Sequence, residues 1–252
     1  MAVSHGKKQI WLMSYRKSLA NSSYTRPEKR VYGRKFGRPL NKTRAEVIHS
    51  LLPKLCVAGD LLKETAELSP SSLFSGYKEC WFEIGFGSGE HLSGLMRRHP
   101  ENAYLGAEPF INGMAAFLKD IKDGPHDKVR VHMDDAMMLA NSLSDESLDG
   151  IYILNPDPWH KKRHNKRRIV NRNNLECFER ILKPGGHLIL STDVPYLADW
   201  MITEVMIYGG FEWSAKSRKD WLEPPEDWIP TAYQTKGARG ADRMCYIFLT
   251  KK

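Results

Sequence analysis

Short apolar runs alternate regularly with helical patterns over most of this chain, and this alternation limits the folds that the chain can adopt. Five runs have the length and character of buried strands: Cys80–Ile84, Ala103–Ala107, Val129–Met133, Leu148–Leu154 and His187–Ser191. Helical patterns follow four of them, at His91–His99, Ile111–Lys122, Asn173–Leu182 and Tyr196–Tyr208. Strand–helix alternation of this kind predicts an α/β fold with a doubly wound, mostly parallel sheet.

Two further strands are expected near the C-terminus, at Phe211–Trp213 and Met244–Thr250, which makes seven in all. The run Lys183–Gly186, with its Pro-Gly-Gly, predicts a turn between a helix and the following strand. A short helix is expected at Ala45–Leu55. A chain of 252 residues fits one sizeable domain with an extension, and we assign that domain to residues 45–252.

Positive charge is concentrated in two segments of the chain. Residues 1–44 contain twelve Lys or Arg and one acid, and residues 160–172 contain seven Lys or Arg and no acid. Because the whole chain carries a formal charge of +8, the rest of it is net acidic. Such segregation points to an anionic polymer as partner. We expect residues 1–44 to form a flexible basic arm whose aromatic side chains either stack on bases or dock the arm onto the body.

Several other classes of protein are disfavoured by the sequence. No apolar stretch reaches eighteen residues and no signal peptide is apparent, so we expect a cytoplasmic protein with no membrane contact. The four cysteines are far apart and form no CxxC pair, which disfavours a zinc site or a disulfide framework.

A glycine-rich loop follows the first strand, in the order Glu83-Ile-Gly85-Phe-Gly87-Ser-Gly89. Glycine lets the backbone turn tightly and approach a ligand where a Cβ would clash. Two glycines also occur in many strand-to-helix turns for packing alone. The flanking residues therefore decide what this loop binds.

Carboxylates around the loop favour S-adenosylmethionine over a dinucleotide. Glu108 ends the second strand, where a carboxylate can accept both ribose hydroxyls, and Asp135 follows the third strand, where one can meet the adenine amino group. The GxGxG spacing departs from the dinucleotide pattern, and Glu90 would oppose a pyrophosphate. S-adenosylmethionine carries a sulfonium and an ammonium, so nearby carboxylates suit it.

The fourth strand runs into Asn155-Pro-Asp157-Pro-Trp159, followed by the basic run up to Arg168. In an open α/β sheet the ligand site lies at the carboxyl ends of the strands. Asp157, held between two prolines, is either a catalytic carboxylate or a helix-capping turn residue. Trp159 either stacks on a base or packs beneath the loop. The histidines in the run show no spacing typical of a metal site, so none is expected.

This loop closely resembles the signature of the bacterial tRNA (guanine-N7-)-methyltransferases, which modify a guanosine in the tRNA variable loop. The resemblance covers about residues 80–250. The matching segments are Phe82–Gly85, Gly106–Glu108, Asp135-Ala136, Pro156–His164, Thr192-Asp193 and Pro230–Gly237.

The resemblance implies a class I, Rossmann-like methyltransferase fold, S-adenosylmethionine as cofactor and tRNA as partner. It implies cofactor contacts by Glu83, Glu108, Asp135 and Asp157, alongside Gly85, Gly87 and Gly89, with Asp157 as the catalytic residue. It implies substrate contacts by Lys161, Asp193 and the family's Thr-x-x-Glu, which here is Thr231 to Gln234 with glutamine in place of glutamate. It assigns RNA contacts to Arg163, His164, Asn165, Lys166, Arg167 and Arg168.

Guanine N7 carries a lone pair at neutral pH, so methylation needs no general base. Alignment and charge complementarity to the cationic product would supply most of the rate. Two alternatives stay open: a methyltransferase of the same fold that acts on another structured RNA such as rRNA, and a non-catalytic RNA-binding protein. We expect a monomer or homodimer with no obligate protein partner.

Overall fold

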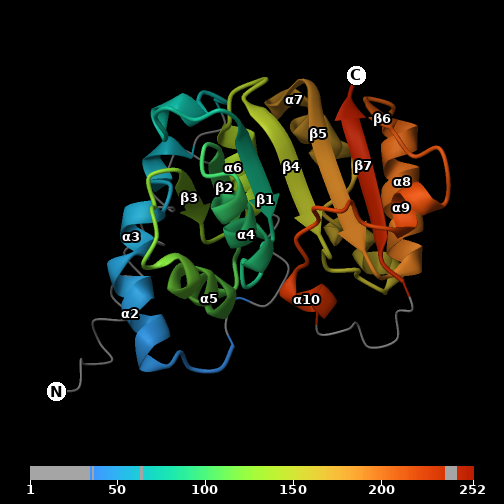
Figure 1. Cartoon of the computed structure of the whole chain (residues 1–252). Coiled ribbons are helices and arrows are strands. Elements are labelled where there is room, and N and C mark those ends of the chain that lie inside the picture. Colours follow the sequence, from blue (N-terminus) through green and yellow to red (C-terminus); the bar gives the residue numbers. More distant parts are fainter. Residues whose placement is uncertain (1–34, 36, 63–64, 236–242) are drawn as a thin grey trace.

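The computed structural model describes residues 35, 37–62, 65–235 and 243–252, which contain a seven-stranded sheet (Figure 1). The strands are β1 (Cys80–Ile84), β2 (Ala103–Ala107), β3 (Val129–His132), β4 (Leu148–Leu154), β5 (Leu182–Thr192), β6 (Phe211–Trp213) and β7 (Cys245–Lys251). Their order is β3-β2-β1-β4-β5-β7-β6. Strands β1 to β5 run parallel, and β7 is antiparallel to both β5 and β6. The predicted doubly wound, mostly parallel sheet is confirmed.

Helices cover both faces of the sheet. They are α2 (Lys42–Ser50), α3 (Leu52–Leu55), α4 (Glu90–Arg98), α5 (Ile111–Ile121), α6 (Ala136–Ser142), α7 (Arg172–Ile181), α8 (Pro195–Tyr208), α9 (Lys219–Leu222) and α10 (Ala232–Thr235). One hydrophobic cluster joins the strands to α6, α7 and α8, and a second joins them to α2, α3, α4 and α5. Helices α4, α5, α7 and α8 match the predicted ranges to within one residue at each end. Among the described residues, none of the helices has the length and apolarity to cross a membrane.

Three local features differ from the sequence prediction. The predicted turn at Lys183–Gly186 lies inside β5, because Leu182 already pairs with Leu148 and the register shifts before Gly150. The glycines there form an irregularity within the strand, with φ of 73° at Gly185. Helix α6 was not predicted, although Asp135 accepts a hydrogen bond from the Met137 N–H at 3.0 Å and caps the helix.

The third difference concerns the boundary of the basic arm, most of which lies outside the described residues. Helix α2 begins at Lys42, before the predicted boundary, because the Asn41 side chain accepts from the Arg44 N–H at 3.0 Å. The residues just before it contact α5: Gly37 N donates to Asn112 Oδ1 at 3.1 Å, and Asn112 Nδ2 donates to the Arg38 carbonyl at 2.8 Å. The described end of the arm is therefore docked on the body.

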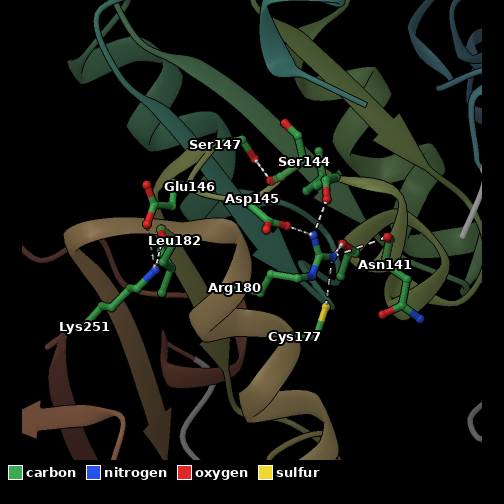
Figure 2. A network of polar contacts seen from close by, with 11 residues as sticks. Asn141, Ser144, Asp145, Glu146, Ser147, Cys177, Arg180, Leu182 and Lys251 are labelled. Carbon is green, nitrogen blue, oxygen red and sulfur yellow. Dashed lines mark hydrogen bonds and ion pairs between the residues drawn. The ribbon is translucent and has the colours of Figure 1, made fainter. Parts of the chain in front are cut away.

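At the edge where β4 and β5 begin, a polar network centres on Arg180 of α7 (Figure 2). Its guanidinium donates to Asp145 Oδ1 and to the Leu143 carbonyl, both at 2.7 Å. Lys251 of β7 donates to the Leu182 carbonyl at 2.8 Å. These contacts connect α7, the segment before β4, and the ends of β5 and β7. The glycine loop after β1 and the Pro-Asp-Pro loop after β4 lie at the opposite edge of the sheet, where these parallel strands end.

Candidate active site

The loop between β1 and α4 turns on three glycines. Gly85, Gly87 and Gly89 have φ of 73°, 58° and 81°, which is the left-handed region that glycine adopts without steric cost. A Cβ at Gly85 or Gly87 would meet no atom within 4 Å, whereas a Cβ at Gly89 would lie 2.4 Å from the Phe117 side chain. Two glycines thus leave space for a ligand, and the third allows α4 to pack on α5.

A cavity of about 300 Å³ lies beside this loop, at the lower end of typical ligand pockets. It is lined by Glu83, Gly85, Phe86, Gly87, Ser88, Glu90, Leu154, Asn155, Thr231 and Tyr233. Four predicted site residues therefore meet here: Glu83, Gly85, Gly87 and Thr231. The lining includes two carboxylates and no Lys or Arg, which suits a cationic ligand better than a pyrophosphate.

Glu83 is held at the floor of this cavity by a buried partner. Its Oε2 lies 2.9 Å from His91 Nδ1 of α4, and both side chains are almost fully buried. His91 in turn contacts the rings of Tyr152 and Trp228, at centroid distances of 4.7 and 5.5 Å. The Glu83 carboxylate is thus fixed in place before any ligand binds.

Glu108, at the end of β2, supports the glycine loop. Its carboxylate accepts from the Gly87 N–H at 2.7 Å and from the Phe110 N–H at 2.8 Å. Burial raises the pKa of this carboxyl to about 7, the two backbone bonds oppose that shift, and the charges of Asp157 and Glu83 add to it. Two buried carboxylates, Glu83 and Glu108, therefore lie close enough to the surface carboxylate of Asp157 for the three charges to interact.

Asp135 lies one strand further along, after β3. One carboxylate oxygen caps α6 as described above, and burial raises the pKa of the carboxyl. The neighbouring Asp134 accepts from Lys35 Nζ at 3.2 Å. Asp135 does not line the cavity, but the parallel order β3-β2-β1 places Asp135, Glu108 and Glu83 in sequence along one edge of the sheet.

The loop after β4 has a strained backbone at both ends of its Pro-Asp-Pro. Asn155 and Trp159 have φ of 49° and 48°. A non-glycine residue in this region raises the free energy of the fold by about 1–3 kcal/mol, and contacts with the surrounding structure must offset this strain. Asp157 lies between them at the surface, yet protein atoms around its carboxyl desolvate it and raise its pKa. Strain with a desolvated carboxylate is typical of a functional loop.

Arg168 holds this loop from beneath. It is 5% exposed, its Nε donates to the Pro158 carbonyl at 3.0 Å, and its guanidinium lies 4.7 Å from the Trp200 ring centroid and 5.5 Å from that of Tyr196. The sequence grouped Arg168 with the RNA-tracking residues, but its inward position gives it a structural role. The one local signal in the sequence is that Arg168 directly precedes the apolar pair Ile169-Val170.

The other cations of the run divide into two groups. Lys161, Lys162, Arg163 and Lys166 are exposed. The guanidinium of Arg167 lies 5.1 Å from the Trp159 ring centroid, and the His164 ring meets that indole edge-on at 5.9 Å. Trp159 therefore packs within its own loop, and Asn165 of the same loop is half-buried.

The C-terminal segment closes the far side of the cavity through a reciprocal cap. Thr231 Oγ1 accepts from the Gln234 N–H at 3.3 Å, and Gln234 Oε1 accepts from the Thr231 N–H at 2.8 Å, which is the capping-box arrangement of a helix start. Gln234 Oε1 also accepts from Trp228 Nε1 at 3.2 Å. The family's Thr-x-x-Glu position is thus occupied by a residue that shapes α10, which lies near the ends of β4 and β5 (Figure 1).

Asp193, at the end of β5, is buried and joined to this segment by Tyr233. Burial raises the pKa of the Tyr233 phenol, and the charge of Asp193 and a hydrogen bond to it raise it further. Asn155 completes the connection, because its backbone N–H donates to the Ser191 carbonyl at 2.8 Å and its Nδ2 donates to Thr231 Oγ1 at 3.3 Å. Sequence reasoning did not single out Asn155; its only signal is an asparagine directly before Pro-Asp-Pro.

A family model described as "Putative methyltransferase" matches residues 78–245 of this chain. Among solved structures, an antibiotic-related methyltransferase covers 76% of the chain and 98% of its own length, with a TM-score of 0.52 and 18% identity. The 16S rRNA methyltransferase KamB covers 72% and 92%, with a TM-score of 0.53 and 14% identity. These likenesses concern the fold. With the sheet order, the glycine loop and the carboxylates, they define a class I S-adenosylmethionine-dependent methyltransferase.

Curated relatives give the narrower family. The chain is 38% identical to the tRNA (guanine-N(7)-)-methyltransferase of Rhizobium johnstonii over 220 residues, covering 87% of this chain and 94% of that one. It is 37% identical to the enzyme of the same name from Brucella melitensis, covering 88% and 94%, and 38% identical to that of Bartonella henselae, covering 90% and 97%. The chain belongs to the tRNA (guanine-N7-)-methyltransferase family.

Proposed function

We propose that this chain transfers the methyl group of S-adenosylmethionine to N7 of a guanine in the variable loop of tRNA. One observation carries the proposal: Asn155 lines the cavity beside the glycine loop and is also the first residue of the basic loop after β4. A small-molecule pocket thereby opens next to the surface that carries exposed cations. In this proposal the enzyme acts in the cytoplasm.

The cofactor would lie along the carboxyl edge of the sheet. We assign the adenine to Asp135, the ribose hydroxyls to Glu108, and the remainder to Glu83 and the open space at Gly85 and Gly87. When bound, S-adenosylmethionine supplies an electrophilic methyl group on a sulfonium. The carboxylates of Glu83, Glu108 and Asp157 would complement its positive charge. Glu83 and Glu108 are buried, so water screens their attraction for the sulfonium less.

The guanine would bind between the loop after β4 and the C-terminal segment. N7 is already a nucleophile, so the protein needs to orient the base and to stabilise the charge that develops on it. In this proposal Asp157 and Asp193 accept hydrogen bonds from the N1–H and amino groups of guanine. Tyr233 is half exposed and adjacent to Asp193, which places an aromatic ring where a base can stack.

Phosphates of the tRNA would contact the exposed cations of the basic loop. Lys161, Arg163 and Lys166 present their charge to solvent and form no ion pair with a carboxylate of the described residues, and the basic arm would add contacts from residues 1–34. Arg167 and His164 would support this surface through Trp159, and Asn165 would do so from its half-buried position in the same loop. Thr231 and Gln234 would act by holding α10 in place.

The test is to incubate the protein with labelled S-adenosylmethionine and unmodified tRNA, digest the product and identify the labelled nucleoside and its position. We expect N7-methylguanosine in the variable loop. Label in another nucleoside, in another loop, or only in rRNA added as a competitor would contradict the proposal. Asp157→Asn, which keeps the shape of the side chain, provides the matched control protein.

A further inference from the structure

One polar atom at the cavity has no role in the proposed binding of cofactor and guanine. Asn155 Oδ1 is buried and has no hydrogen-bond partner among the described residues, although Asn155 lines the cavity. A buried acceptor without a donor is destabilising, because it has lost its hydrogen bonds to water and gained none within the protein. The Nδ2 of the same side chain donates to Thr231 Oγ1, and this bond orients the amide. Oδ1 is therefore the atom of the amide that has no partner among the described residues.

The backbone of Asn155 shows that this orientation is built in. Its φ of 49° lies in the left-handed region, where asparagine is among the few side-chain-bearing residues that are tolerated. Its N–H is bonded to the Ser191 carbonyl. The residue is thus held by β5 on one side and by the α10 cap on the other, and its oxygen is left over.

The position of Asn155 along the sheet identifies the part of the cofactor that it faces. Strand order β3-β2-β1-β4 places Asp135, Glu108, Glu83 and Asn155 one after another along the same edge. If the adenine lies at Asp135 and the ribose at Glu108, the amino-acid end of the cofactor extends past Glu83 toward β4. That end carries an ammonium group with three donors, and the cavity there is lined by carboxylates without a cation.

We propose that Asn155 is a cofactor-binding residue whose side-chain oxygen accepts a hydrogen bond from the ammonium group of the amino-acid end of S-adenosylmethionine. This inference rests on the proposed function, since it assumes that cofactor and that orientation. Asn155 then contacts the amino-acid end of the cofactor with Oδ1. Through its Nδ2 bond to Thr231, it also contacts the segment proposed to hold the guanine.

The experiment compares two ligands by calorimetry: S-adenosylhomocysteine, which has the amino-acid end, and 5′-methylthioadenosine, which lacks it. The main variant is Asn155→Gly, because glycine keeps the left-handed backbone without strain. We expect the affinity for S-adenosylhomocysteine to fall roughly ten- to hundredfold, as for a hydrogen bond to a charged group, and the affinity for 5′-methylthioadenosine to stay within about twofold. Asn155→Asp, which keeps an acceptor, should retain binding of S-adenosylhomocysteine.

A matched control is Glu146→Gly, which also replaces a left-handed residue (φ of 50°) but lies before β4, at the end of that strand away from Asn155. It should leave both affinities unchanged. Equal losses for both ligands in Asn155→Gly, or no loss for either, would overturn the inference while leaving the proposed function standing. Loss of S-adenosylhomocysteine binding in Asn155→Asp would overturn the acceptor role. A wild-type protein that binds neither ligand would overturn the proposed function itself.

Discussion

Two neighbouring loops form the candidate site, and they are held in different ways. The loop after β1 is held by its own backbone: left-handed glycines make the turn, and Glu108 accepts from the Gly87 N–H beneath it. The loop after β4 is held by side chains, above all by the buried Arg168 at the end of its own basic run, which donates to the Pro158 carbonyl. Strands β1 and β4 are paired, so the two loops lie side by side.

The difference follows from what each loop is proposed to bind. A cofactor of fixed size calls for a preformed pocket, and backbone groups in a tight turn provide one. A polymer with many phosphates calls for charge at the surface, so the cations of the second loop must stay in solvent. A loop with its charges turned outward needs an internal anchor, and Arg168 provides it. Substitutions in each loop should therefore have separable effects on cofactor binding, on chemistry and on tRNA binding.

The largest effect is expected at Asp157. Replacing Asp157 with Ala removes a carboxylate proposed to stabilise developing charge, and the single-turnover rate should fall by about 100-fold or more. Affinity for S-adenosylhomocysteine and the melting temperature should change little. If Asp157→Ala keeps the wild-type rate at saturating tRNA, this loop does not contribute to the chemical step.

A change at Glu108 should act on the other loop. Glu108→Ala removes the proposed ribose contact and also leaves the Gly87 N–H without its acceptor, so affinity for S-adenosylmethionine should fall roughly ten- to hundredfold. Calorimetry on the free enzyme provides the measurement. Unchanged affinity would mean that the glycine loop needs no support from β2.

The same residue predicts a pH dependence. Burial raises the pKa of Glu108 to about 7, above its ordinary value, so the free carboxyl is protonated below that pH and gains charge as the pH rises. Only the ionised form accepts from both ribose hydroxyls, so cofactor affinity should rise between about pH 6 and about pH 8. Glu108→Gln, which does not titrate, should show a flatter profile at this step.

Arg168 and Lys166 offer the most direct comparison within the basic loop. Arg168→Ala should destabilise the loop and lower the methylation rate about tenfold, while the salt dependence of tRNA binding stays near that of the wild type. Lys166→Ala should do the reverse, lowering the slope of log affinity against log salt by about 1 and leaving the melting temperature unchanged. Equal salt slopes for the two variants would show that burial does not separate their roles.

Removal of residues 1–30 should weaken tRNA binding severalfold and lower its salt slope by about 0.7 to 0.9 for each phosphate that the arm neutralises. Cofactor affinity should be nearly unaffected, because the truncated protein keeps the described residues that contact α5, Lys35 and Gly37 among them. A parallel decrease in both affinities would assign the arm a structural role.

The smallest effect is expected at Gln234. Glutamate in its place keeps the two hydrogen bonds that Oε1 accepts from Thr231 and Trp228, so α10 should keep its position. The change replaces Nε2, which has no partner among the described residues, with a charged oxygen in a partly buried place, and desolvation opposes the gain. Single-turnover rates should differ by less than about tenfold. A larger gain would mean that guanine recognition here needs a third carboxylate.

The glycine turn of the candidate site was predictable because it depends on the conformations that individual residues can adopt. Gly85 and Gly87 were predicted from the need for a tight turn, and the cavity lies beside them. The family resemblance pointed to Thr231 and Gln234 as substrate contacts, whereas the capping box that they form was not predicted. The role of Asn155 could not be predicted, because it depends on a bond to β5 and another to Thr231, which lies 76 positions further along the chain.

By itself the sequence determined the alternation of strands and helices, because the periodicity of apolar residues is a local property that each segment carries without the others. It likewise determined the positions of the glycine turn and of the Pro-Asp-Pro loop. The tertiary structure alone decided that β7 lies between β5 and β6, that Arg168 points inward while Lys166 faces solvent, and that Glu108 supports the loop of a neighbouring strand. Each of these depends on contacts between distant segments, where burial in the assembled core, and not residue type, selects one partner from several that are chemically equivalent.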